Sequence, residues 1–187
     1  MKKSTAISRR VKSCWEHISK EEYEEALIDF FPALDKTSQL RYPKIKTVGA
    51  RIEAFLSDEE GLISALATEN FIINCKFGEY TFPKAIYKLG RNPISHEGEL
   101  DARLTFDNMD GIRISGDTWN LPPTYISALA ISVMIAPENL NESINTPTSI
   151  SLYGNTFPIN TLWGARHLVR DLICTHFRNP DLFNHRK

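Results

Sequence analysis

The stretch RNPISH, residues 91–96, places an arginine, an asparagine and a histidine within six residues. A histidine with a pKa near its ordinary value of about 6.5 can both accept and donate a proton close to neutral pH. An arginine presents a fixed fork of donors that suits phosphate oxygens, and an asparagine adds a neutral donor and acceptor. Arg91, Asn92 and His96 therefore supply what metal-free phosphodiester cleavage needs, namely proton transfer, charge stabilisation and positioning.

Two further residues are candidates for supporting this set. Glu97 follows His96 directly, and a nearby carboxylate favours the charged form of an imidazole. We include Tyr87, at the start of the same polar stretch, as a second supporting residue. On an ideal helix Arg91 and His96 would be separated by roughly 7.5 Å of rise and 140° of rotation, so they can flank a groove without sharing one face.

Other interpretations stand beside the catalytic one. Arginine, asparagine and histidine near a helix end often only neutralise the last carbonyls. Pro93 should push Asn92 away from helical angles and break or kink the helix there. Arg170 and His176 form a second pair with the same residue types on the last predicted helix, whereas the adjacent Arg166 and His167 are expected to be a solvated pair. No P-loop, G-x-G-x-x-G or H-E-x-x-H pattern is present, and we expect no cofactor and no metal.

The composition describes an ordinary globular protein. A chain of 187 residues, with 42% apolar and 24% charged residues, is long enough for one domain with its own core. A formal net charge of −1 argues against an electrostatic nucleic-acid binder but leaves room for a local basic patch. Charges interrupt every apolar run near the N-terminus, and the longest run, Tyr125 to Ala136, is too short to span a bilayer. We therefore expect a cytoplasmic protein with no membrane partner.

Apolar spacing predicts a mainly helical fold. The spacing of helix faces and capping patterns indicates helices over residues 7–18, from 22 to about 42, over 46–56, from 57 onward, over 82–91, over 125–136 and from 160 onward. Pro32 should kink or break the second of these. The helix over 125–136 is apolar nearly all round, so we expect it to be buried at the centre. Alternating runs predict one β-hairpin with strands near 104–106 and 112–114 and another over 150–157.

RNPISH resembles the R-N-x-x-x-H signature of the HEPN superfamily (higher eukaryotes and prokaryotes nucleotide-binding domains). The resemblance extends over roughly Glu21 to Phe177, with helices before the motif and a hairpin after it, and it rests on the following segments: Glu25 to Asp35, Arg41-Tyr42-Pro43, Arg51 to Leu56, SHEGEL at 95–100 and Trp163-Gly164-Ala165-Arg166. It differs from members with a tyrosine two residues after the histidine, because Gly98 stands there.

The resemblance implies a HEPN-like helical bundle over residues 1–187 with one or two small β-hairpin additions. Residues 1–20 would form a peripheral N-terminal helix, 101–118 a hairpin insertion and 138–158 a loop and hairpin. It also implies a homodimer in which two motif helices build one cleft, and a metal-independent endoribonuclease connected with toxin or phage-defence systems. Arg91 would stabilise the scissile phosphate, His96 would transfer protons, and Asn92 would orient one of these two side chains or the RNA. The alternative is a non-catalytic HEPN-like module that acts through a regulatory protein partner.

Overall fold

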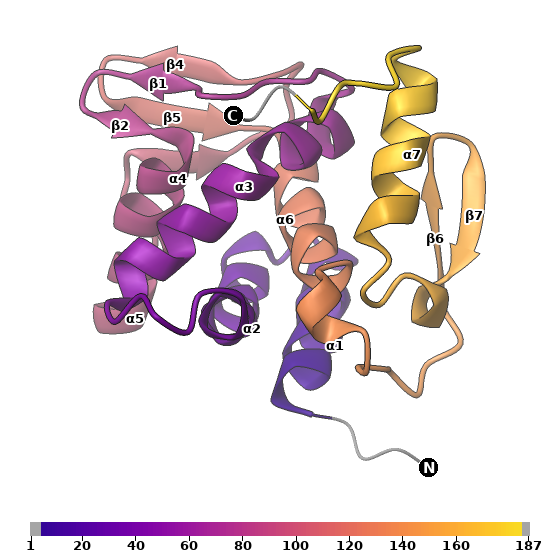
Figure 1. Ribbon diagram of the computed structural model, residues 1–187. Helices are drawn as coiled ribbons and strands as arrows, with labels where there is room; N and C mark the ends of the chain where they lie inside the picture. The colour runs from indigo at the N-terminus through magenta and orange to yellow at the C-terminus, as the bar shows by residue number, and fades with distance from the viewer. Residues whose placement is uncertain (1–4, 185–187) are drawn as a thin grey trace.

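The computed structural model describes residues 5–184 and is mainly helical (Figure 1). Three long helices come first, and a short helical segment, a central helix and a C-terminal helix follow. The helices are α1 (Ala6–Ile18), α2 (Tyr23–Arg41), α3 (Val48–Thr68), α4 (Phe82–Ala85), η1 (Ile86–Arg91), α5 (Asn92–His96), α6 (Thr124–Met134), η2 (Pro137–Asn139), η3 (Ile159–Thr161) and α7 (Arg166–His176). The strands are β1 (Lys76–Phe77), β2 (Tyr80–Thr81), β3 (Leu104–Phe106), β4 (Arg113–Ser115), β5 (Thr118–Leu121), β6 (Ser149–Leu152) and β7 (Asn155–Pro158).

Helix α6 lies in the middle of the molecule (Figure 1). Nine of its eleven residues are buried, and α1, α2 and α3 all pack against it. Such burial requires an apolar sequence on every face of the helix, which is what residues 125–136 supply. The prediction of a buried central helix is confirmed.

Helix α1 is not peripheral, because Ile7, Val11 and Cys14 are buried against α2 and α6. Residues 1–4 of the predicted N-terminal helix, and residues 185–187 of the predicted domain, lie outside the described residues. Helix α2 begins at Tyr23 and continues past Pro32 to Arg41, so the predicted break is wrong. The ring of Pro32 is exposed, and buried side chains on either side of it hold both halves of the helix against the core.

The predicted helices over 46–56 and from 57 onward are one helix, α3. The pattern Ser57-Asp58-Glu59-Glu60 imitates a capping box, but it lies in the middle of α3. Glu59 and Glu60 are both buried. Glu59 belongs to a charge cluster described below, and Glu60 accepts hydrogen bonds from the backbone N–H groups of Asn74 at 3.0 Å and Cys75 at 2.8 Å. Their acidic side chains serve tertiary contacts rather than a helix start.

The strands form three small sheets within residues 5–184. The hairpin β6–β7 confirms the prediction over 150–157. The hairpin predicted from strands near 104–106 and 112–114 is wrong, because β5 lies between them, parallel to β3 and antiparallel to β4. Segment 101–118 therefore forms no closed hairpin insertion, and the actual tight turn is Gly116-Asp117. The short hairpin β1–β2 was not predicted from the sequence.

The RNPISH stretch lies on a helical segment that runs without interruption through α4, η1 and α5. Thr81 caps its start, where its side-chain oxygen accepts a hydrogen bond from Lys84 N–H at 3.4 Å. Pro93 does not break it: Asn92 keeps helical angles of φ −65° and ψ −54°. Asn92 N–H instead donates to the carbonyl of Tyr87, five residues back, in a wide π-type turn. This turn accommodates the proline, so the predicted kink is replaced by a change of helix type.

Candidate functional site

Close packing fixes the position of the segment 82–96. Phe82, Ile86 and Leu89 are buried on its inner face. At Gly90, an added Cβ would lie 2.9 Å from Phe31 on α2, so only glycine allows the two helices to approach this closely. The helical segment is therefore held rigidly against α2, and its outer face is directed away from the core.

Tyr87 has a packing role in this arrangement. An added Cβ at Gly49 of α3 would lie 2.7 Å from the ring of Tyr87, so the ring lies directly over this glycine. Tyr87 is half-buried and packs against the core, and Lys88 Nζ lies 5.6 Å from its ring centroid. The contact of the Tyr87 ring with Gly49 fixes η1 against the start of α3, and the supporting role predicted for Tyr87 in the site stays a prediction.

The three predicted catalytic side chains lie on neighbouring parts of one exposed surface. Arg91 and Asn92 are half-buried and His96 is exposed. Asn92 and His96 are four residues apart within α5, so their Cβ atoms are about 5–6 Å apart on the same face, with Arg91 one position round the helix. Among residues 5–184, these three side chains have no hydrogen bond or ion pair with the rest of the chain. Their polar groups are available to a ligand.

Glu97 ends the helical segment and is exposed beside His96. Its backbone N–H donates to the carbonyl of Pro93 at 2.7 Å. The chain then returns to the core, where Leu100 N–H donates to a carboxylate oxygen of Glu24 at 2.5 Å and Asp101 N–H donates to the carbonyl of Leu89 at 3.0 Å. These bonds fix the loop that follows the motif.

A buried charge cluster is the principal feature that sequence reasoning missed. Glu59 is fully buried, and its Oε1 accepts hydrogen bonds from Arg41 at 2.6 Å and from Arg166 at 2.7 Å. Arg41 also donates to both carboxylate oxygens of Glu138, at 3.0 and 3.1 Å. Arg170 lies 3.5 Å from Glu59 Oε2. We call these five residues the Glu59 cluster; it ties α7 and η2 to α2 and α3.

Electrostatics keeps Glu59 ionised. Burial alone would raise its pKa, but the charges of Arg41 and Arg166 outweigh burial and lower the pKa from its ordinary value. The prediction that Arg166 belongs to a solvated pair is therefore wrong. The alternative pair of Arg170 and His176 is not one site either: Arg170 reaches Glu59, whereas the ring of His176 packs at a tilt of 41° against the ring of Tyr153, with centroids 4.4 Å apart.

Two clefts lie outside the predicted site. One, of about 990 Å³, is bordered by the α1–α2 turn, the end of α3, the loop over 108–111 and the start of α6. The other, of about 260 Å³, lies between the turns of β1–β2 and β4–β5. Within residues 5–184, no group of three or more histidine, cysteine, aspartate or glutamate side chains is placed to hold a metal ion. In the same range, no helix has the length and apolar character needed to cross a membrane.

Comparison with known proteins gives one match. A family model described as Rv1289 matches residues 6–184, nearly the whole chain. That description names no activity, ligand or partner. No curated protein and no solved structure matches the chain significantly.

Proposed function

We propose that this chain, which belongs to the Rv1289 family, is a metal-independent endoribonuclease of HEPN type. The observation that carries the proposal is the state of three polar side chains. Arg91, Asn92 and His96 lie together at the end of a rigidly packed helical segment, and within residues 5–184 none of them is used by the fold. The resemblance of RNPISH to the HEPN signature supplies the reaction class.

The chemistry assigns one step to each residue. His96 accepts the proton of an RNA 2′-hydroxyl, whose oxygen attacks the adjacent phosphorus. The bond from phosphorus to the 5′-oxygen breaks, and the proton held by the His96 imidazolium passes to that oxygen, which leaves as a 5′-hydroxyl. Arg91 faces the phosphate and balances the charge that develops on its free oxygens. Asn92, four residues before His96 on the same face, orients the imidazole or the RNA. The products are a 2′,3′-cyclic phosphate and a 5′-hydroxyl.

The test is incubation of the purified protein with mixed RNA in EDTA. We expect cleavage without added metal, and we expect His96→Ala to lower the rate by roughly 10²–10⁴-fold. Arg91→Ala should cost a comparable factor, with the double variant less than additive because both groups act in one transition state. His167→Ala is the matched control, because His167 is an exposed helical histidine outside the motif. A rate that falls equally in His96→Ala and His167→Ala would contradict the assignment.

A second copy of the chain completes the proposed site. The two clefts described above are lined by other residues than those of the motif. A symmetric dimer would bring two α5 helices together and enclose the phosphate between them. Light scattering at high micromolar concentration should therefore give the mass of a dimer. If a clean dimer leaves diverse RNA intact both in EDTA and in magnesium, the catalytic proposal fails. The non-catalytic HEPN-like interaction module then takes its place.

A further inference from the structure

The segment 82–96 carries three cations ahead of His96. Lys84, Lys88 and Arg91 follow one another along it, and all three are half-buried or exposed. Aromatic rings lie beside the two lysines: Lys84 Nζ is 5.4 Å from the ring centroid of Tyr80, and Lys88 Nζ is 5.6 Å from that of Tyr87. Cations interleaved with aromatic rings are how proteins hold single-stranded nucleic acid. We call this surface the basic stripe; it ends at the RNPISH motif.

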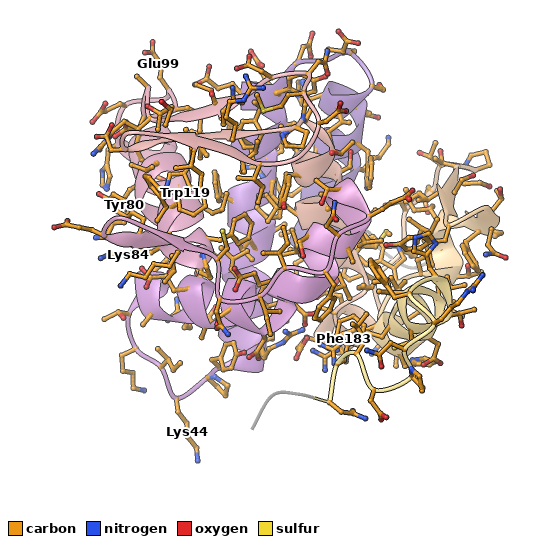
Figure 2. The ribbon with its side chains drawn as sticks, turned by 90° about the horizontal axis from the view of Figure 1, so that it is seen from above. Lys44, Tyr80, Lys84, Glu99, Trp119 and Phe183 are labelled. Carbon is orange, nitrogen blue, oxygen red and sulfur yellow. The ribbon has the colours of Figure 1, made fainter. Side chains whose placement is uncertain are left out.

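The other end of the basic stripe is the pocket of about 260 Å³ between the β1–β2 and β4–β5 turns. Phe77 is opposite Tyr80 in the β1–β2 register, so the two rings lie on one face of this hairpin. Phe77 is 41% exposed, so its ring is accessible to a ligand. Trp119 of β5, which is only 1% exposed, lies at the base of the pocket, and Figure 2 shows it next to Tyr80. The rings of Phe77 and Tyr80 therefore provide the flat aromatic surface that a planar ligand could meet.

Charge inside the pocket differs from charge along the stripe. Glu79 and Asp117 are exposed at the rim. The Arg103 side chain makes two hydrogen bonds to Asp101, at 2.6 and 2.9 Å, and lies 3.8 Å from an Asp117 carboxylate oxygen. Carboxylates at the rim repel a phosphate, but they accept hydrogen bonds from the amino groups of a base. The pocket suits the base of a nucleotide, and the lysines outside it suit the backbone.

We propose that this pocket holds an unpaired base of single-stranded RNA whose phosphates follow Lys84 and Lys88 toward the motif. The inference rests on the proposed ribonuclease function, which names RNA as the ligand. Twelve residues of helix from Lys84 to His96 correspond to about 18 Å, so the base in the pocket lies several nucleotides from the scissile bond. A base within a duplex is stacked on both faces and cannot enter the pocket. The pocket therefore selects single strands and sets a distance to the cut.

Binding is measured separately from cleavage. Fluorescence anisotropy with labelled homopolymeric RNA, in EDTA and in a His96→Ala background, reports affinity whether or not the protein is an enzyme. We expect Phe77→Ala to weaken binding about tenfold, the loss of one base–aromatic stack. Lys88→Gln should reduce the slope of log affinity against log salt by about 0.7, since one phosphate contact is lost. The matched controls are Ile28→Ala, whose side chain is exposed to a similar extent (39%), and Lys36→Gln, an exposed lysine on α2.

The outcomes separate the two proposals. Tight single-stranded binding that depends on Phe77 and Lys88 supports the inference, even if the wild-type protein cleaves nothing. Cleavage that is indifferent to both substitutions overturns the inference and leaves the proposed function standing. Equal affinity for a blunt RNA duplex, or equal losses in the Ile28→Ala control, also overturns it. Melting curves of each variant exclude loss of fold as the cause.

Discussion

The Glu59 cluster and the RNPISH surface use similar residue types in opposite ways. In the cluster, three arginines surround two carboxylates, and the side chains of Glu59 and Arg41 are 0% and 8% exposed. At the motif, Arg91 and His96 lie at the surface and, among residues 5–184, are not engaged by other side chains. The paired charges of the Glu59 cluster hold helices together. The charged and polar side chains of the motif have no such partners, so a ligand can bind them.

The difference also separates two kinds of sequence signal. Members of the Glu59 cluster are far apart in the chain, with 18 residues from Arg41 to Glu59 and 107 from Glu59 to Arg166. The motif residues fall within six positions. A short motif can be recognised in the sequence because its residues are adjacent. A cluster of residues from distant parts of the chain can be recognised only in the folded structure.

The substitution with the largest expected effect on stability is Glu59→Gln, which tests whether the Glu59 cluster holds the fold together. This change leaves Arg41, Arg166 and Arg170 facing a neutral amide in a buried site, and removing one partner of a buried ion pair costs about 3–5 kcal/mol. We expect that loss in the free energy of unfolding measured in urea. Glu53→Gln, on the same helix but half-buried, should change stability by less than about 0.5 kcal/mol. Equal effects of the two substitutions would mean that the cluster contributes no special stability.

A smaller change in the free energy of unfolding is expected when pH is lowered through the titration range of Glu59. Because the pKa of Glu59 is lowered in the folded state, its contribution is fully present above the unfolded value, near 4.5. It is lost as pH falls through the lower folded pKa. The difference in unfolding free energy between wild type and Glu59→Gln should therefore be constant near neutral pH and should narrow below about 4.5. A difference that widens on acidification would show that the folded-state pKa is raised, not lowered.

The smallest effect is expected at the motif itself. Arg91→Ala and His96→Ala remove side chains that, within residues 5–184, have no internal partner, so each should change the unfolding free energy by less than about 0.5 kcal/mol. Thermal and urea unfolding of both variants beside wild type would measure this. If either variant lowered the free energy of unfolding by several kcal/mol, that residue would have a structural role like those of the Glu59 cluster.

Much of the helical framework could be predicted because burial imposes spacing. Apolar positions in α1 follow the helical period, and those of α6 cover every face, as a central helix requires. The hairpin β6–β7 turns at Tyr153-Gly154, where both residues have positive φ, so Gly154 is the turn signal in the sequence. The parallel pairing of β3 with β5 could not be predicted from local sequence. Strands of three or four residues contain too few alternating positions to choose a partner, so their neighbours in space decide the pairing.

The chemistry of the candidate site was visible as residue types, but its geometry was not. The rule for residues before proline predicts a break at Asn92, and it fails because the hydrogen bond from Asn92 to Tyr87 shifts the helix to a wider turn. Tyr87 was selected for its position in the polar stretch, but its ring contacts Gly49 of α3. Neither the wide turn nor this contact can be predicted from neighbouring residues in the sequence.

The wide turn at η1 has the effect of a one-residue insertion in an α-helix. The turn joins two helical stretches whose faces would not line up on a continuous α-helix. Phe82 and Ile86, before the turn, face the core, and Asn92 and His96, after it, face outward. If the same residues formed an ordinary α-helix throughout, everything downstream of the turn would be rotated by about 100°. The polar set would then turn relative to the core while its composition stayed the same. The geometry of this segment therefore determines where the motif side chains point, just as the residue types determine their chemistry.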